Sequence, residues 1–354
     1  MTKTQGPEES SLEVRATRGA DEEAREAFVR AHPEATFFHQ RGWARFVERT
    51  WGHADRELLA WRDGRIVGVL PLMSCAGSLR RAKLVSLPYA VYGGPLARGH
   101  GVAERLAEAA HELALGERAR YVELRCLRDP GLAWPGTDLY WTFQRELPRE
   151  SCEVLARMPK KARAEARKGR ERFGLELGQG SWYLEDLWRF FLRNKHALGS
   201  PGLPLGHFRG LLAQFGEDVF VHVVRDGKRP IAAVLSLAFR DTLVAYYAGS
   251  EAGADREKSA SNFMYLALQE WAVTKGFRVF DFCRSRADSG AFAFKRHQGF
   301  EPTPLHYRYD LVRARKVPDF HPSNPRTRIL RRVWSRLPFR LARALSKPLG
   351  RRLC

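Results

Sequence analysis

The residues best suited to chemistry lie within 279–300, VFDFCRSRADSGAFAFKRHQGF. A short apolar strand carries Asp281 between two phenylalanines, so period-two alternation predicts that its carboxylate faces a cleft. Arg284 and Arg286 follow two residues apart, which predicts that they share one strand face, and Lys295 comes after the turn. An ammonium can stabilise an oxyanion, a carboxylate can accept a proton, and guanidinium groups can bind carboxylate or diphosphate. We take Lys295, Asp281 and Arg284 as candidate catalytic residues, and Arg286 as a candidate substrate-binding residue.

Each of these residues also has a purely structural interpretation. Lys295 could be a surface lysine that runs past aromatic rings towards solvent. Asp281 could be a paired structural carboxylate, and the two arginines could belong to a solvated turn. The residues alone leave these alternatives open.

A second candidate region is the loop 86–96, SLPYAVYGGPL, where a strand runs into Tyr89, Tyr92, Gly93 and Gly94. Two aromatic rings and a permissive backbone at a strand end suit the approach of a substrate. Ordinary turn chemistry is the alternative. We expect these four residues to bind substrate.

Basic charge is concentrated in two segments of a chain whose net charge is +20. The helix expected at 160–172 includes Arg163 and Arg167 and has basic residues around most of its circumference. Such crowding is unfavourable without an anion, which indicates binding to a tRNA backbone or a lipid-linked diphosphate. A solvated helix face is the alternative, and an arginine-rich composition could make the chain basic without any role in binding.

The second basic segment, 326–354, carries no acidic residue. Leucines and Trp334 recur there at helical spacing between arginines, a pattern typical of a helix that lies on an acidic membrane surface. The alternative is a helix packed on its own domain. We expect peripheral contact of this tail with acidic inner-membrane lipid.

The order of expected elements indicates an internal duplication. Helices, a hairpin turning at Asp63-Gly64, a strand, a helix and a strand fill the first half, and a similar series with a hairpin at Asp226-Gly227 fills the second. We therefore predict an α/β (α+β) fold with two related domains whose mixed sheets are flanked by helices. The predicted boundaries are a disordered N-terminus at 1–15, domains at 16–150 and 151–315, and a basic amphipathic tail at 316–354.

Composition narrows the cellular setting. No apolar run approaches the roughly 20 residues that span a bilayer, and the N-terminus lacks a secretory signal pattern. Five scattered cysteines and eleven histidines form no metal-binding motif, so no metal is predicted. We expect a reduced, cytoplasmic protein with peripheral contact at the inner membrane.

Several segments together resemble the Fem family of aminoacyltransferases in the GNAT superfamily, and more closely its FemAB-like branch associated with exosortase (PEP-CTERM) systems. The resemblance is carried by SLPYAVYGGPL (86–96), MPKKARAEARKGRERFGLEL (158–177), KHALGSPGLP (195–204), FDFCRSRADSGAFAFKRHQGFEP (280–302) and NPRTRILRRVWSRLP (324–338). It implies tandem GNAT-like domains and a lysine, Lys295, near the reacting carbonyl. Phe294 and Asn262 are further expected substrate-binding residues.

The resemblance implies transfer of an aminoacyl or acyl group onto an amine or hydroxyl of a cell-envelope or exopolysaccharide precursor. A lipid-linked or polysaccharide precursor is the expected partner, and tRNA could be another. The long helical arm of well-known Fem enzymes is absent from this sequence, which puts the handling of tRNA in doubt.

The donor is left open between aminoacyl-tRNA and acyl-CoA, and no other cofactor is predicted. Acetyl-CoA transferases of this fold have a glycine-rich turn before their long helix, whereas this chain has GSEAGADREKSASN at 249–262. The missing glycine spacing argues against CoA. Two alternatives are kept, an acyl-CoA N-acyltransferase and a non-catalytic scaffold that holds a glycan at the membrane.

Overall fold

The computed structural model describes residues 11–76, 82–99, 101–318 and 325–352, with side chains left out at 325–328. The chain forms two compact units. Unit 1 comprises Met1–Thr137 and His306–Val317, and unit 2 comprises Asp138–Leu305 and Pro318–Cys354. Strand pairing accounts for the difference from the expected boundaries, because Gln144–Glu146 joins the sheet of unit 2 and His306–Asp310 joins a sheet of unit 1.

The described residues of unit 1 form two sheets and three α-helices. The four-stranded sheet has the order β1 (Glu13–Ala16), β3 (Leu58–Arg62), β4 (Arg65–Leu70), β7 (Leu96–Ala97). The six-stranded sheet has the order β2 (Ala54–Asp55), β5 (Met73–Ala76), β6 (Ala82–Val85), β8 (Val122–Cys126), β19 (His306–Asp310), β9 (Gly136–Thr137). The helices are α1 (Glu22–Ala31), α2 (Arg41–Trp51) and α3 (Val102–Gly116).

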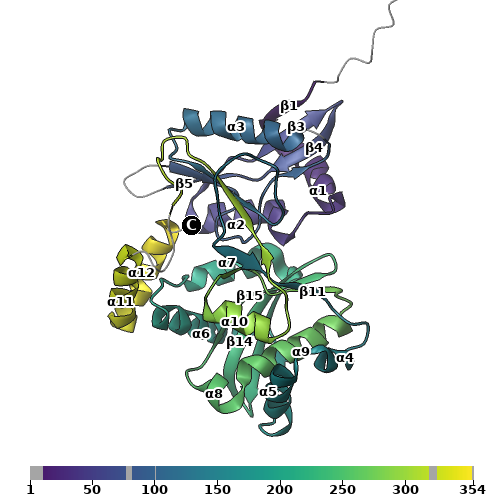
Figure 1. Ribbon diagram of the computed structural model, residues 1–354, viewed down its shortest axis with the longest axis vertical. Coiled ribbons are helices and arrows are strands. Elements are labelled where there is room, and N and C mark those ends of the chain that lie inside the picture. The colour runs from purple at the N-terminus through teal and green to yellow at the C-terminus, as the bar shows by residue number, and fades with distance from the viewer. Residues whose placement is uncertain (1–10, 77–81, 100, 319–324, 353–354) are drawn as a thin grey trace, which may run out of the picture. The chain divides into compact units, whose positions relative to one another are not determined.

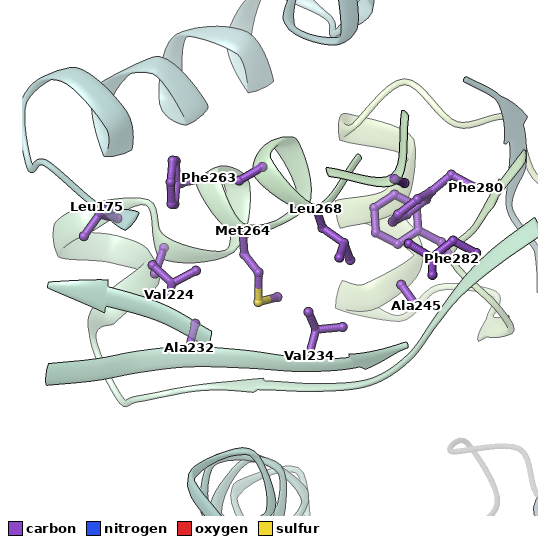
Figure 2. Packing of buried hydrophobic residues seen from close by; sticks show 14 of the residues in the cluster. Leu175, Val224, Ala232, Val234, Ala245, Phe263, Met264, Leu268, Phe280 and Phe282 are labelled. Carbon is purple, nitrogen blue, oxygen red and sulfur yellow. The ribbon is translucent and has the colours of Figure 1, made fainter. Parts of the chain in front are cut away.

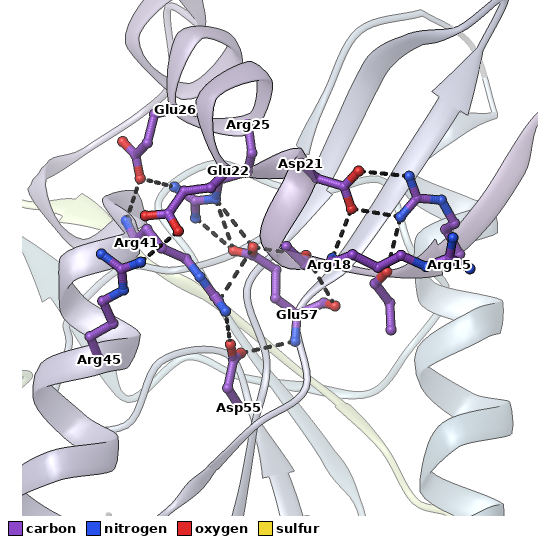
Figure 3. A network of polar contacts seen from close by, with 12 residues as sticks. Arg15, Arg18, Asp21, Glu22, Arg25, Glu26, Arg41, Arg45, Asp55 and Glu57 are labelled. Carbon is purple, nitrogen blue, oxygen red and sulfur yellow. Dashed lines mark hydrogen bonds and ion pairs between the residues drawn. The ribbon is translucent and has the colours of Figure 1, made fainter.

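A buried ionic network joins α1 and α2 of unit 1 to the start of β3 (Figure 3). Arg25 is 1% exposed, and its Nη2 donates to Glu57 Oε2 at 2.6 Å. Arg41 pairs with both Glu57 and Asp55. Burial alone would raise the pKa of Glu57, but the Arg25 and Arg41 guanidinium groups outweigh burial and hold it below its usual value. Removing one partner would leave a buried charge unpaired, so the network fixes these elements together.

The main sheet of unit 2 has six strands. Figure 1 shows helices of this unit, among them α6 (Leu184–Ala197) and α9 (Ala260–Thr274), packed beside these strands. The order is β11 (Gln144–Glu146), β16 (Val279–Asp281), β15 (Thr242–Ser250), β14 (Arg229–Phe239), β13 (Val219–Asp226), β12 (Glu176–Gln179). A small sheet has the order β17 (Ser285–Arg286), β10 (Tyr140–Thr142), β18 (Thr303–Pro304). The helices are α4 (Glu153–Arg157), α5 (Lys160–Glu171), α6 (Leu184–Ala197), α7 (Leu205–Phe215), α8 (Ala254–Lys258), α9 (Ala260–Thr274), α10 (Gly290–His297), α11 (Pro325–Arg336) and α12 (Phe339–Arg352).

The core of unit 2 lies between α9 and this sheet (Figure 2). Met264 and Leu268 point from α9 onto Val224 and Val234, whose side chains alternate with those on the other face. Phe280 in β16 and Phe282, which directly follows this strand, belong to the same core. Burial of these aromatic and aliphatic side chains fixes β16 against α9.

The pairing of β15 with β16 is the feature that shapes the site. The two strands are parallel and pair at three positions, Thr242 to Val279, Leu243 to Phe280 and Val244 to Asp281. Beyond these pairs β15 continues to Ser250, while β16 ends and the chain turns at Cys283, whose φ is +59°. The strands therefore part, and their last residues are free to border a cavity.

Helix α5 has a narrow apolar stripe despite its many basic residues. Ala162, Ala166 and Gly169 are buried, and a β-carbon at Gly169 would lie 2.8 Å from Phe263 Cβ of α9. Small residues thus allow the two helices to approach closely. Within the described ranges, no helix is long and apolar enough to cross a membrane.

Candidate active site

A cavity of about 1230 Å³ opens in unit 2 where β15 and β16 part. Its walls are the end of β15, the start of α9, the segment 282–295, the end of α6 and parts of α11 and α12. Ligand sites usually have volumes of roughly 300–1,000 Å³, so this cavity can accommodate a large substrate.

Lys295 lies in the wall of this cavity with only 9% of its surface exposed. Its Nζ donates to the carbonyl oxygens of Cys283 at 2.9 Å and Arg284 at 3.3 Å. Burial lowers the pKa of Lys295 to about 8, and Cys283 and Asp281 only partly offset that effect. The side chain is therefore a mostly protonated ammonium at neutral pH, with a third N–H that neither carbonyl occupies.

Asp281 lies behind the cavity wall and positions the turn that holds Lys295. It is 1% exposed, and the cavity lining does not include it. Its Oδ1 accepts from the Cys283 amide at 2.6 Å, and its Oδ2 accepts from Gln144 Nε2 at 2.8 Å. These bonds support the left-handed conformation of Cys283, whose carbonyl receives the lysine. The cleft-facing orientation expected from alternation is not found, because the strand ends at Asp281 and the chain turns at once.

The structure separates the two arginines that were expected on one strand face. Arg284 is exposed, with its guanidinium 4.3 Å from the centre of the Tyr140 ring, and it does not line the cavity. Arg286 is half-buried and does line it. The turn at Cys283 breaks the strand between Asp281 and Ser285, so period-two alternation does not hold across it.

Phe294 and Asn262 also line the cavity. Phe294 packs its ring on Tyr265 at 5.6 Å between centroids, and Asn262 Oδ1 accepts from the buried Gln298 Nε2 at 2.6 Å. The fold therefore brings together four of the predicted site residues, Lys295, Arg286, Phe294 and Asn262.

Sequence comparison matches the part of unit 2 that supplies most of this cavity's lining to a known domain family. Residues 156–296 match the model of the acetyltransferase (GNAT) domain family. This part of the chain is similar to GNAT acetyltransferase domains and has the GNAT fold. The match includes Lys295, β15, α9 and β16, and it favours an enzyme over the scaffold considered above. No curated protein matches the sequence.

Several solved structures are similar to this chain over both of its units and not only over the matched residues 156–296. "Crystal structure of FemX" has a TM-score of 0.63 at 12% identity, covering 84% of this chain and 97% of its own. A tandem GNAT protein from the clavulanic acid biosynthesis pathway has a TM-score of 0.56 at 14% identity, covering 87% and 100%. L-PGS from Bacillus licheniformis has a TM-score of 0.52 at 15% identity, covering 89% and 97%. These likenesses confirm the predicted fold class of tandem GNAT-like domains.

GNAT acyltransferases take acyl-CoA or aminoacyl-tRNA as donors and need no further cofactor. In the part of the chain that the structure describes, no group of three or more His, Cys, Asp or Glu could hold a metal ion.

The four residues predicted in the loop 86–96 lie in unit 1 and pack inside it. Tyr92 is 1% exposed, and Tyr89 stacks on Trp51 with its hydroxyl 3.1 Å from His53 Nε2. Gly93 and Gly94 lie against backbone or side-chain atoms that a β-carbon would approach within 3 Å. Close packing inside unit 1 accounts for these glycines.

Arg163 and Arg167 lie on α5 and do not line the cavity of the GNAT domain. Arg163 is half-buried, with Nη1 3.3 Å from the Ala156 carbonyl oxygen, and Arg167 is exposed 3.7 Å from Glu171. Acidic side chains thus relieve part of the charge crowding on this helix.

Four charged residues at the cavity were not predicted as site residues: Lys195, Asp255, Asp288 and Arg331. Lys195 lies at the end of α6, and burial lowers its pKa, an effect that the Arg284 charge increases. Arg331 belongs to the tail that the sequence assigned to a membrane surface. Residues so distant along the chain give no local signal that they meet at one cavity.

Asp255 belongs to α8, and its side chain reaches the start of α9, where GNAT enzymes that use CoA bind a pyrophosphate. Its Oδ1 accepts from the Ser261 amide at 2.7 Å, and its Oδ2 accepts from the Ser250 hydroxyl at 2.8 Å. Helix N-termini bind phosphate through backbone amides that have no partner within the helix. Here a carboxylate already satisfies one of them and adds negative charge.

We predict that the Lys295 ammonium titrates near pH 8 in the folded protein, because its burial in the cavity wall disfavours the charged form. NMR of isotopically dimethylated lysines measures this titration, and the signal missing from Lys295→Met assigns it. Titration of that signal near pH 10.4, the value of an unperturbed lysine, would contradict the geometry.

Proposed function

We propose that this protein is a Fem-like acyltransferase that moves an aminoacyl group onto an amine or hydroxyl of a cell-envelope or exopolysaccharide precursor. The observation that carries the proposal is the Lys295 ammonium, buried in the cavity wall and oriented by two carbonyl oxygens. A fixed cation in a site of low polarity stabilises developing negative charge far better than one in water.

The proposed reaction is direct attack of the acceptor on the donor carbonyl. The acceptor nitrogen or oxygen bonds to the acyl carbon, and negative charge develops on the carbonyl oxygen beside Lys295 Nζ. The bond to the leaving group then breaks, and the proton released by the acceptor neutralises that group. Asp281 acts as a positioning residue through the Cys283 turn, and no covalent enzyme intermediate forms.

Aminoacyl-tRNA is the donor that we favour. The carboxylate of Asp255 opposes a pyrophosphate at the start of α9, which disfavours CoA. The basic face of α5, where Arg167 is exposed and Arg163 is half-buried, suits the phosphate backbone of tRNA. The structural likeness to FemX and the sequence resemblance to the exosortase-associated branch support an envelope or exopolysaccharide acceptor.

An acyl-CoA-dependent N-acyltransferase is the second candidate, because the matching family model describes an acetyltransferase. In that case Asp255 would have to release the Ser261 amide before CoA could bind. The two candidates share Lys295 and differ in the donor.

We predict that cells lacking this gene lose an aminoacyl or acyl mass from their envelope polysaccharide, as measured by mass spectrometry. Complementation with Lys295→Met should not restore that mass, since the loss of one oxyanion donor costs about 100-fold or more in rate. Arg296→Ala, an exposed neighbour on α10, is the matched control and should restore it. Full restoration by Lys295→Met would remove the assignment.

The donor can be tested by isothermal titration with acetyl-CoA. We predict no binding in the micromolar range, because one α9 amide is already bound to Asp255. Asp255→Asn keeps the shape and removes the charge, so it should bind acetyl-CoA more tightly than the wild type does. Low-micromolar binding by the wild type would instead establish the acyl-CoA alternative.

We further propose that the C-terminal helices contact acidic lipid of the inner membrane, so that the protein is cytoplasmic and peripheral. Ile329 of α11 and Leu341 and Leu345 of α12 are exposed apolar side chains that do not line the cavity. The segment 326–354 has ten basic residues and no acidic one. Exposed leucines beside arginines match the chemistry of an anionic bilayer surface.

The membrane contact predicts co-sedimentation with vesicles that contain phosphatidylglycerol but not with pure phosphatidylcholine vesicles. The double substitution Leu341→Asp and Leu345→Asp should abolish it, because these residues are four apart on one face of α12. Leu115→Asp, at an exposed leucine of α3 in unit 1, is the control and should bind normally. Equal sedimentation of all three proteins would contradict the contact.

A further inference from the structure

The C-terminal helices contribute one wall of the cavity. Leu330, Arg331, Val333, Trp334 and Leu349 line it, although they follow Lys295 by more than thirty residues of chain. Contact with a membrane would explain the exposed leucines of this tail that lie outside the cavity. It would not explain the residues of the tail that line the cavity.

These helices are attached to the end of α6 by specific contacts. Arg331 Nε and Nη2 both donate to the Leu198 carbonyl oxygen, at 3.2 and 3.0 Å. A β-carbon at Gly199, whose φ is +70°, would lie 2.4 Å from the Arg331 carbonyl oxygen, so glycine is required for this approach. His196 Nε2 lies 3.0 Å from the Leu337 carbonyl oxygen. Arg331 is thus placed at the cavity by its backbone and by two of its nitrogens.

Arg286 enters the same cavity from β17. Its Nε is buried and has no hydrogen-bond partner within the described ranges of the chain. Burial lowers the pKa of Arg286, and the positive charge of Arg331 lowers it further, so the two guanidinium groups repel each other. Among the described residues, neither arginine forms an ion pair with a carboxylate.

The two carboxylates that line the cavity do not neutralise this pair. Asp255 is engaged by Ser250 and Ser261, and Asp288 is exposed and makes no ion pair with a described residue. Lys195 and Lys295 add two further cations to the lining. Like charges without a counterion are unfavourable in a partly dry cavity, and a bound dianion would turn this repulsion into attraction.

We propose that Arg286 and Arg331 bind a phosphate or diphosphate group of the substrate between them, and that this binding holds the C-terminal helices closed over the cavity. The proposal rests on the proposed function, because it assigns the phosphate to the same substrate that reacts at Lys295. Guanidinium groups match phosphate oxygens with paired N–H donors, which an ammonium cannot do. The substrate class is accordingly a phosphorylated precursor, with its phosphate at the arginines and its acyl-transfer centre at the lysine.

The anion site is tested by isothermal titration of the full chain with sodium pyrophosphate and, separately, with sodium phosphate. Arg286→Gln and Arg331→Gln should each weaken binding about 10-fold or more, because each loses a charge-assisted hydrogen bond. Arg332→Gln is the matched control, since Arg332 is the exposed neighbour on α11 and does not line the cavity. Tighter binding of pyrophosphate indicates a diphosphate substrate, and tighter binding of phosphate indicates a monophosphate.

Equal affinity of the wild type and both arginine variants for pyrophosphate and phosphate would overturn the proposed phosphate site. A complete lack of binding of both anions by the wild type would also overturn it. Lys295→Met separates this proposal from the proposed function, because it should keep pyrophosphate affinity while losing transfer. If the arginine variants bound pyrophosphate as tightly as the wild type while the wild type still transferred the acyl group, only the phosphate site at Arg286 and Arg331 would be refuted. Circular dichroism of each variant establishes that it is folded.

Closure of the helices is tested by hydrogen exchange of residues 329–350 with and without pyrophosphate. Exchange should slow in the wild type and stay unchanged in Arg286→Gln, whose substitution lies outside these helices. Unchanged exchange in the wild type at saturating pyrophosphate would overturn the closing role.

Discussion

The parting of two parallel strands is the constraint on which the site depends. β15 and β16 pair at only three positions before β16 ends. The turn that follows requires a left-handed residue, Cys283, and Asp281 holds the amide of that residue. Because the turn fixes the carbonyl groups of Cys283 and Arg284, it also fixes the ammonium that donates to them. The position of the Lys295 ammonium thus depends on the turn at the end of β16.

Both units contain two parallel strands connected through a helix, but the chain after the first of these strands differs between them. In unit 1, β6 pairs in parallel with β8 across α3, as β15 does with β16 across α9. There the chain after β6 packs inside the unit, where the carbonyl oxygens of Ala90 and Val91 accept from Arg125 and Tyr307. A cavity of about 180 Å³ is found beside Gly94 and Cys126, against about 1230 Å³ in unit 2. The larger cavity, which contains Lys295 and Arg286, therefore lies in unit 2.

Local pattern was enough to predict much of this architecture. The Asp-Gly hairpins, the strand at 279–281 and the placement of Lys295, Phe294, Asn262 and Arg286 followed from short segments of sequence. Alternation failed for Asp281 and Arg284, because a left-handed turn at Cys283 interrupts the strand and a cysteine gives no sign of that conformation. Asp255, Lys195 and Arg331 could not be predicted, since their roles depend on contacts between distant segments of the chain.

The dependence of the transfer rate on pH tests the central claim most directly. If a protonated Lys295 stabilises the oxyanion, single-turnover transfer from the donor should decline as the pH rises through about 8, where burial places the pKa of this lysine. A rate that climbs steadily to pH 9.5, following only deprotonation of an attacking amine, would contradict the account.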